Sequence, residues 1–360
     1  MIAGAAAEDS LARIEMLIAI GRYQDALAQL ALVIRDHPDH CYALCLRAQA
    51  QLQLDRPELA RLAAEAAMRS DPTAEWPVRL LSIAVRELGD PTRAVELATV
   101  SVRMEPDLWE PRAVLAIALS ESGTSSKNAG SRQRARRVAH SAVRIAPDEP
   151  QPYFVVGLVA DRMGRYSDAE AAYRQALRLD PQHAAARNNL SVILSRRRDY
   201  IGAARGFTEA AAGDSRLVIA RRNVDYVVIR LVMRAQLVVL AATFGALAGP
   251  QLLGVPSHWV SFVAAVTGVL VIVWSVVRFV RATPRRLHRY LATMPGRDRL
   301  ASAWVTLLCV SMLVLCVASA MSGRARWLGN LVACLALAIA LVLNYLRATR
   351  RRDRPDRTRS

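Results

Sequence analysis

The chain has 360 residues, of which 53% are hydrophobic and 22% charged, and its formal net charge is +17. Residues 1–217 hold 28 basic and 27 acidic side chains, whereas residues 218–360 hold 20 basic and 4 acidic ones. A basic composition often indicates nucleic-acid binding, but here the arginine clusters flank apolar runs, as in membrane proteins. The composition therefore argues against a folded nucleic-acid-binding domain.

The N-terminal segment and the cysteines indicate where the first part of the chain resides. Met1 to Ile20 has no basic start and contains Glu8, Asp9 and Glu15, so it reads as an amphipathic helix rather than a secretory signal. The five cysteines form no disulfide framework, because three of them lie inside apolar runs. We expect the N-terminal part to remain in a reducing cytoplasm.

Residues 7–217 show an internal period of 34 residues, the length of a helix-turn-helix repeat. The blocks are 7–40, 41–74, 75–108, 109–149, 150–183 and 184–217, and only the fourth is longer, by an insert placed within residues 123–132. Position 20 is alanine in all six blocks: Ala26, Ala60, Ala94, Ala135, Ala169 and Ala203. Position 32 is proline in five of them: Pro38, Pro72, Pro106, Pro147 and Pro181.

These residue types fit two antiparallel helices per block. A small side chain at position 20 lets the helices approach closely, and proline at position 32 stops the second helix. Position 15 needs a turn conformation with positive φ and is glycine at Gly21, Gly89, Gly123 and Gly164, with Asp55 and Arg198 as departures.

The pattern over residues 7–217 resembles the tetratricopeptide repeat family. The resemblance implies an all-α solenoid of six helix pairs whose concave face commonly binds an extended peptide or a partner helix. In that family, positions 2, 5, 9, 12 and 13 line the groove. The candidate groove residues are Tyr42, Gln49, Trp76, Arg79, Ile83, Arg86, Phe154, Leu158, Arg162, Asn188 and Arg196, and the same positions also include Leu11 and Cys45.

Beyond the repeats, the sequence predicts a capping and juxtamembrane helix over residues 218–234 and then four transmembrane helices. The uncharged runs lie at about residues 236–255, 258–277, 300–322 and 327–346, each near the 20 residues needed to cross a bilayer. Their loops give the orientation, because arginines gather before the first run, between the second and third, and in the tail 347–360. The positive-inside rule then places the repeats and the C-terminus in the cytoplasm, at the inner membrane of a bacterium.

The central loop carries a short amphipathic pattern that favours contact with an anionic membrane surface. Leu287, Tyr290, Leu291 and Met294 recur at helical spacing beside basic residues. The candidate lipid contacts are Arg281, Arg285, Arg286 and Arg289. The arginine-rich tail could also suggest nucleic acid, but the topology rule already accounts for it, so we expect no nucleic-acid partner.

No known catalytic motif is present, neither a phosphate-binding Gly-Lys loop nor a nucleophile elbow, zinc-protease motif or dinucleotide fingerprint. We therefore expect no enzyme activity and no cofactor. The sharpest metal candidate joins His37, His40, Cys41 and Cys45, but turn and packing roles explain these residues better, and no metal is expected.

The sequence thus predicts a membrane-anchored scaffold that recruits a partner protein through its groove. Membrane lipids, and a membrane protein or a second copy of the chain, are further expected partners of the spans. The alternative is a regulatory or non-catalytic subunit of an envelope-biogenesis or export complex. In that case the spans contact lipid or a membrane partner, and the repeats regulate the complex.

Overall fold

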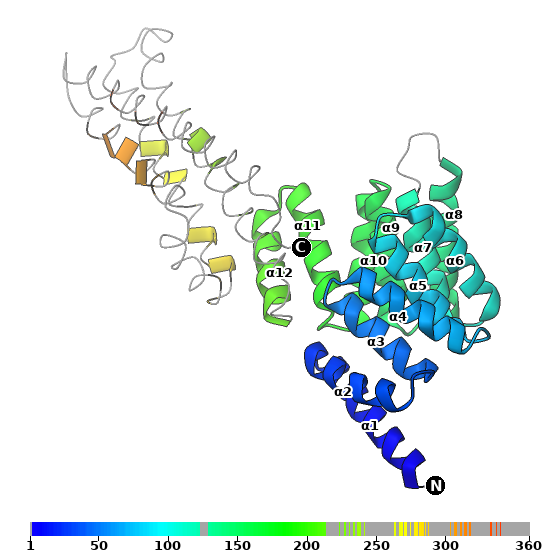
Figure 1. Ribbon diagram of the computed structural model, residues 1–360. Helices are drawn as coiled ribbons and strands as arrows, with labels where there is room; N and C mark the ends of the chain where they lie inside the picture. The colour runs from blue at the N-terminus through cyan, green and yellow to red at the C-terminus, as the bar shows by residue number, and fades with distance from the viewer. Residues whose placement is uncertain are drawn as a thin grey trace. The chain divides into compact units, whose positions relative to one another are not determined.

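The computed structural model describes residues 2–122 and 129–213, and scattered positions from residue 223 onward. These residues contain no strand, and residues 2–122 and 129–213 contain the helices that Figure 1 labels. The helices are α1 (Ile2–Ala19), α2 (Tyr23–Asp36), α3 (Cys41–Gln53), α4 (Pro57–Ser70), α5 (Glu75–Glu87), α6 (Pro91–Met104), α7 (Trp109–Ser122), α8 (Ala129–Ile145), α9 (Pro150–Arg162), α10 (Tyr166–Leu179), α11 (Ala184–Arg196) and α12 (Tyr200–Gly213). The all-helical repeat fold expected from the sequence is therefore confirmed.

The helix ends follow from local sequence. Proline occupies the first turn of α4, α6 and α9, where its missing N–H costs nothing and its fixed φ suits a helix. At the start of α6, the Asp90 carboxylate accepts a hydrogen bond from the Arg93 backbone N–H at 2.9 Å. The turns inside pairs have positive φ at Gly21, Gly89 and Gly164, as position 15 predicts.

Each of the six blocks contains one pair of packed helices, and the alanine column lies where the two helices meet. All six alanines of position 20 are fully buried, with 0% exposure. A larger side chain there would push the paired helices apart, because protein interiors are packed as densely as organic crystals. The period that is visible in the sequence is therefore a packing period.

The first unit, Met1–Ala186, is held together by cores that cross from one pair to the next. The first helices of successive pairs contact one another from α1 through α9, and each second helix packs on its own first helix. One buried cluster joins Leu44 and Cys45 of α3 to Leu81 of α5. Another joins Leu115 of α7 to Val155 of α9. Figure 1 shows these helices stacked in pairs.

The second unit, Arg187–Ser360, begins inside α11 and includes α12. The expected end of the repeats at residue 217 lies outside the described residues and stays a prediction. A buried cluster in this unit joins Ala203, Ala204 and Phe207 of α12 to Val227 and Leu287. In the same unit, the Arg234 guanidinium lies 4.4 Å from the centre of the Tyr200 ring. Helix α12 is thus bound to residues that follow the repeats.

The four predicted spans and the basic tail lie outside the described residues, apart from isolated positions such as Trp274 and Val310. Among the residues that are described, no helix is both long and apolar enough to cross a membrane. Most of the predicted insert, residues 123–128, also lies outside the described part of the chain. The spans consequently stay a prediction from sequence.

Candidate functional site

A cavity of about 490 Å³ lies between α3 and α5, on first helices of neighbouring pairs. Helix α5 presents one face to it, because Trp76, Arg79, Ile83 and Arg86 recur at spacings of three and four. The rest of the lining comes from α3, the α3–α4 turn, the first residue of α4 and other α5 positions: Gln49, Leu52, Gln53, Asp55, Pro57, Leu80 and Glu87. Five candidate groove residues, including Gln49, therefore share one cavity.

Trp76 forms one wall of this cavity and is held by an aromatic contact. Its ring lies 5.3 Å from the Tyr42 ring, at an interplanar angle of 53°. The Tyr42 hydroxyl in turn donates a hydrogen bond to the Glu15 carboxylate of α1 at 2.5 Å. This hydrogen bond raises the pKa of Tyr42 to about 12, because losing the proton would place two negative charges together. The aromatic wall is thus anchored across α1, α3 and α5.

Arg79 is oriented by a carboxylate on its own helix. Its guanidinium Nε lies 3.1 Å from Glu75, one turn earlier in α5, and the Glu75 side chain is only 5% exposed. The Ser101 hydroxyl donates a further hydrogen bond to Glu75. A buried carboxylate must be paired in this way, so Arg79 has a structural role as well as a place in the cavity wall.

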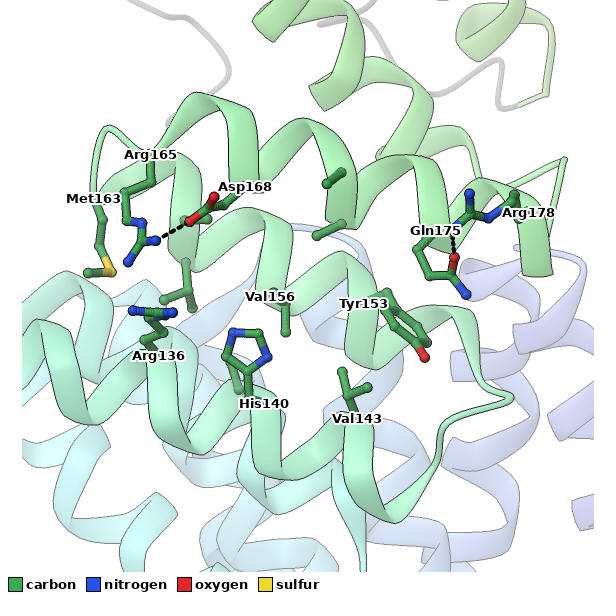
Figure 2. Close-up of a pocket in the computed structure, with 15 residues that line it drawn as sticks. Arg136, His140, Val143, Tyr153, Val156, Met163, Arg165, Asp168, Gln175 and Arg178 are labelled. Carbon is green, nitrogen blue, oxygen red and sulfur yellow. Dashed lines mark hydrogen bonds and ion pairs between the residues drawn. The ribbon is translucent and has the colours of Figure 1, made fainter.

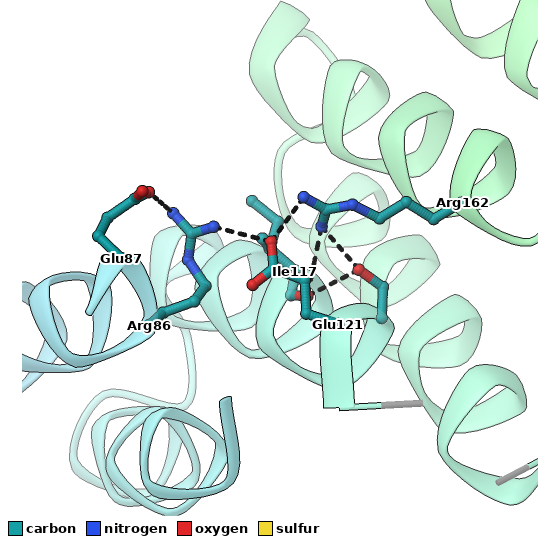
Figure 3. Close-up of polar contacts among 6 residues, drawn as sticks. Arg86, Glu87, Ile117, Glu121 and Arg162 are labelled. Carbon is teal, nitrogen blue, oxygen red and sulfur yellow. Dashed lines mark hydrogen bonds and ion pairs between the residues drawn. The ribbon is translucent and has the colours of Figure 1, made fainter. Parts of the chain in front are cut away.

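Arg86 and Arg162 converge on one carboxylate, Glu121 of α7 (Figure 3). The Arg86 guanidinium lies 2.9 Å and that of Arg162 2.6 Å from the same Glu121 oxygen. Arg162 also donates to the Ser120 hydroxyl at 2.8 Å, and Arg86 pairs with Glu87. This chain of charges crosses α5, α7 and α9, and partly neutralises both arginines.

The remaining candidates lie elsewhere. Phe154 packs against the rings of Tyr173, at 5.9 Å, and His183, at 5.1 Å, and Leu158 is half-buried on α9. Neither residue lines the cavity. Asn188 and Arg196 belong to the second unit, where Asn188 is 7% exposed and accepts from the Asn223 amide at 3.3 Å.

Two residues that periodicity places on the groove are in the core instead. Leu11 is 8% and Cys45 1% exposed, so neither can contact a ligand in an open groove. The reason is geometric, since a first helix contacts its own partner helix and both neighbouring pairs, which leaves a narrow open strip. Ser120 and Glu121 are not among the candidate groove residues. They nevertheless occupy positions 12 and 13 of the fourth block, so the same register predicts that they face the groove.

Two residues of the metal candidate, His40 and Cys45, have structural roles in the helices. The His40 Nδ1 atom accepts a hydrogen bond from the Ala43 backbone N–H at 3.3 Å and thereby caps α3. Burial raises the pKa of the Cys45 thiol, which disfavours the thiolate that a metal requires. The described residues contain no group of three or more metal-ligating side chains.

Of the candidate membrane-surface arginines, Arg281 and Arg285 are described, and both are exposed. Arg286 and Arg289 lie outside the described residues. Leu287, which the amphipathic pattern assigns to the bilayer, is instead fully buried in the cluster with Phe207. The amphipathic pattern does not reveal that Leu287 packs against other residues of this chain.

Comparison with known proteins agrees with the repeat fold. The tetratricopeptide repeat family model matches residues 11–75 and 154–216, so the chain contains tetratricopeptide repeats. A tetratricopeptide repeat protein from Parabacteroides merdae superposes with a TM-score of 0.52 at 14% identity, over 60% of this chain and 81% of that one. A thermophilic tetratricopeptide repeat protein from Thermus thermophilus gives a TM-score of 0.48 at 20% identity, over 51% and 95% of the two chains.

A curated relative shares a shorter stretch. The probable biofilm formation methyltransferase WspC of Pseudomonas aeruginosa is 34% identical over 86 residues, which is 24% of this chain and 20% of that protein. The chain thus spans about a fifth of the length of the curated relatives it matches.

Proposed function

We propose that the chain is a membrane-anchored, non-catalytic scaffold whose repeats bind a peptide segment or helix of a partner protein between α3 and α5. The observation that supports this proposal most strongly is the cavity of about 490 Å³, which has an aromatic wall and charged groups already fixed in place. Tetratricopeptide repeats are interaction modules, and a preorganised groove lowers the entropic cost of binding.

The lining indicates the kind of partner segment. Arg79 and Arg86 are balanced by Asp55 and Glu87 in the same cavity, and both arginines are already held by carboxylates. A strongly acidic segment would gain little from such paired cations. A segment that places an apolar or aromatic side chain on Trp76, and polar groups along its flanks, fits the cavity better.

The membrane part of the proposal rests on the uncharged runs between residues 235 and 346 and on the arginine bias of their loops. It assigns the chain to a bacterial inner membrane as a multi-pass protein, with the repeats and the C-terminus in the cytoplasm. Extraction of membranes at alkaline pH tests the anchoring, since an integral protein stays in the pellet. Release of the full-length protein into the supernatant contradicts it.

Absence of catalysis is the third part of the proposal. The similarity to a probable methyltransferase lies within 86 residues, and no catalytic motif accompanies the repeats in this sequence. Titration of the full-length protein with S-adenosylmethionine in a calorimeter is expected to give no binding heat. Saturable binding would reopen the question of enzyme activity.

Partner capture tests the groove itself. Full-length protein is crosslinked in membranes and purified, in parallel with a Trp76→Ala/Ile83→Ser variant and a Leu59→Ala/Leu62→Ser control, whose residues are exposed on α4. Loss of a partner in the groove variant alone supports the scaffold. Identical partners in all three proteins contradict it and favour the alternative of a subunit that binds its membrane complex through the spans.

A further inference from the structure

A second cavity, of about 530 Å³, lies among α8, α9 and α10 and shares no residue with the first (Figure 2). Its base is apolar and belongs to the core, with Ala139 and Val159 each 1% exposed and Ala172 8% exposed. Tyr153 and Met163 bound the hollow along α9. A volume of roughly 300–1,000 Å³ is typical of pockets that hold a ligand.

The rim of this cavity is basic. Arg136 and His140 reach it from α8, and Arg165 and Arg178 from the α10 side (Figure 2). The single carboxylate in the lining, Asp168, is already paired with Arg165 at 2.5 Å. The rim therefore keeps an excess of positive charge, unlike the balanced lining between α3 and α5.

Helix α8 extends the positive charge beyond the rim. It carries five arginines and no carboxylate: Arg132, Arg134, Arg136, Arg137 and Arg144. None of the five makes a salt bridge to another residue in the described parts of the chain, and all but Arg132 are exposed. Unpaired like charges on one helix repel one another and raise its free energy, which an anionic partner would relieve.

From this combination we infer a second docking site, which binds an acidic peptide segment of a partner protein with one apolar side chain seated on the cavity base. The carboxylates of this segment form ion pairs with Arg136 and Arg178, and with the other exposed arginines of α8. The apolar side chain fills the hollow between Tyr153 and Met163. Arginine is well suited to this recognition because its guanidinium forms two parallel hydrogen bonds with a carboxylate.

The shape of the site favours a peptide over a lipid bilayer. A membrane-binding surface needs apolar side chains that protrude into the bilayer, whereas here the apolar atoms line the bottom of a hollow. A single side chain that projects from a peptide can reach them. The proposal is independent of the first groove, because the two cavities share no residue.

The test measures fluorescence anisotropy of a labelled peptide of glutamates with one central phenylalanine, added to full-length protein in neutral phosphatidylcholine nanodiscs. The site variant is Arg136→Glu/Arg178→Glu. The control is Arg69→Glu/Arg103→Glu, which changes two exposed arginines of α4 and α6 and alters the net charge equally. We expect at least a tenfold loss of affinity in the site variant and less than a twofold change in the control.

Two further measurements separate this site from simple charge attraction and from the first groove. Replacing the central phenylalanine of the peptide by glycine is expected to weaken binding about tenfold, and Trp76→Ala is expected to leave binding unchanged. Equal loss in the site and control variants, or no effect of the phenylalanine, overturns the proposal. Binding of phosphatidylglycerol vesicles that depends on Arg136 and Arg178, without peptide binding, overturns it in favour of a lipid surface.

Discussion

The ring of Tyr173 lies directly against the backbone of Gly157, so that a Cβ atom at position 157 would be only 2.5 Å from the ring. Tyr173 is fully buried, and α9 and α10 meet at this contact. A glycine on the first helix and a large ring on the second therefore form one unit of packing. This contact explains why the fifth block combines a glycine with a tyrosine at these two positions.

Gly157→Ala should destabilise the first unit by about 1–3 kcal/mol, because the buried ring cannot move away without disturbing its own neighbours. Gly130→Ala is the matched control, since a Cβ there meets no atom within 4 Å, and its effect should stay below about 1 kcal/mol. Hydrogen exchange of α9 and α10 amides measures the difference. Equal protection in both variants would show that the tyrosine relaxes freely.

Glu121 is expected to stabilise the stacking of α5, α7 and α9. Glu121→Gln removes the charge that Arg86 and Arg162 share, and their side chains are only 17% and 31% exposed. We expect the free energy of unfolding to fall by about 1–2 kcal/mol, which lies between the values for exposed and buried ion pairs. Glu96→Gln breaks the ion pair with Arg93, in which the two side chains are 58% and 59% exposed, and should lower the free energy of unfolding by less than about 0.5 kcal/mol. Denaturant unfolding compares the two, and equal losses contradict a special role for Glu121.

His183 should make the stability depend on pH. Burial lowers the pKa of His183 below its ordinary value of 6.5, with Asp180 opposing the shift. Its Nδ1 atom accepts from the Ala186 N–H at 3.2 Å, and Nε2 lies 3.0 Å from the Gln151 amide oxygen, a pattern that requires the neutral ring. The unfolded state thus binds more protons, and stability falls as the pH drops below about 6.5.

The variant His183→Asn isolates this effect, because asparagine retains a capping acceptor but does not titrate in this range. Wild type should lose more stability than His183→Asn between pH 7.5 and pH 5, measured by denaturant unfolding at both values. His140, whose pKa is also lowered by burial and by Arg136, is present in both proteins and cancels in the comparison. Parallel losses would rule out a contribution from His183.

The sequence predicts the repeat fold well because the same packing contact recurs in every block, so the residues that make it recur at the same position of each block. The six buried alanines of position 20 could be placed without any structure, and five candidate residues do line one cavity. The register also places Cys45 on the groove, although its side chain is buried. A helical period predicts which way a helix face points, but it does not predict how wide the exposed part of that face is.

The pairing of charges was beyond sequence reasoning. Arg86 and Arg162 are 76 positions apart, and their convergence on Glu121 depends on how far three helices are offset along the stack. Long side chains choose among many rotamers, so a pattern of arginines does not show which of them are neutralised. The charges of the cavity at α5 are balanced and those of the cavity at α8 are mainly basic, and this difference follows from side-chain positions that the sequence does not give.

The last prediction concerns two residues that depart from glycine at position 15. Asp55 and Arg198 have φ of 57° and 66°, the same left-handed conformation that Gly21, Gly89 and Gly164 adopt. A side chain in that region costs roughly 1–2 kcal/mol, and aspartate tolerates it better than arginine. Arg198→Gly should therefore stabilise the protein by about 0.5–1 kcal/mol and Asp55→Gly by less, because added unfolded-state entropy offsets part of the gain. Thermal unfolding measures both, with Gly164→Ala as the opposite change; a lower Tm for Arg198→Gly would mean that the arginine makes contacts that outweigh its backbone strain.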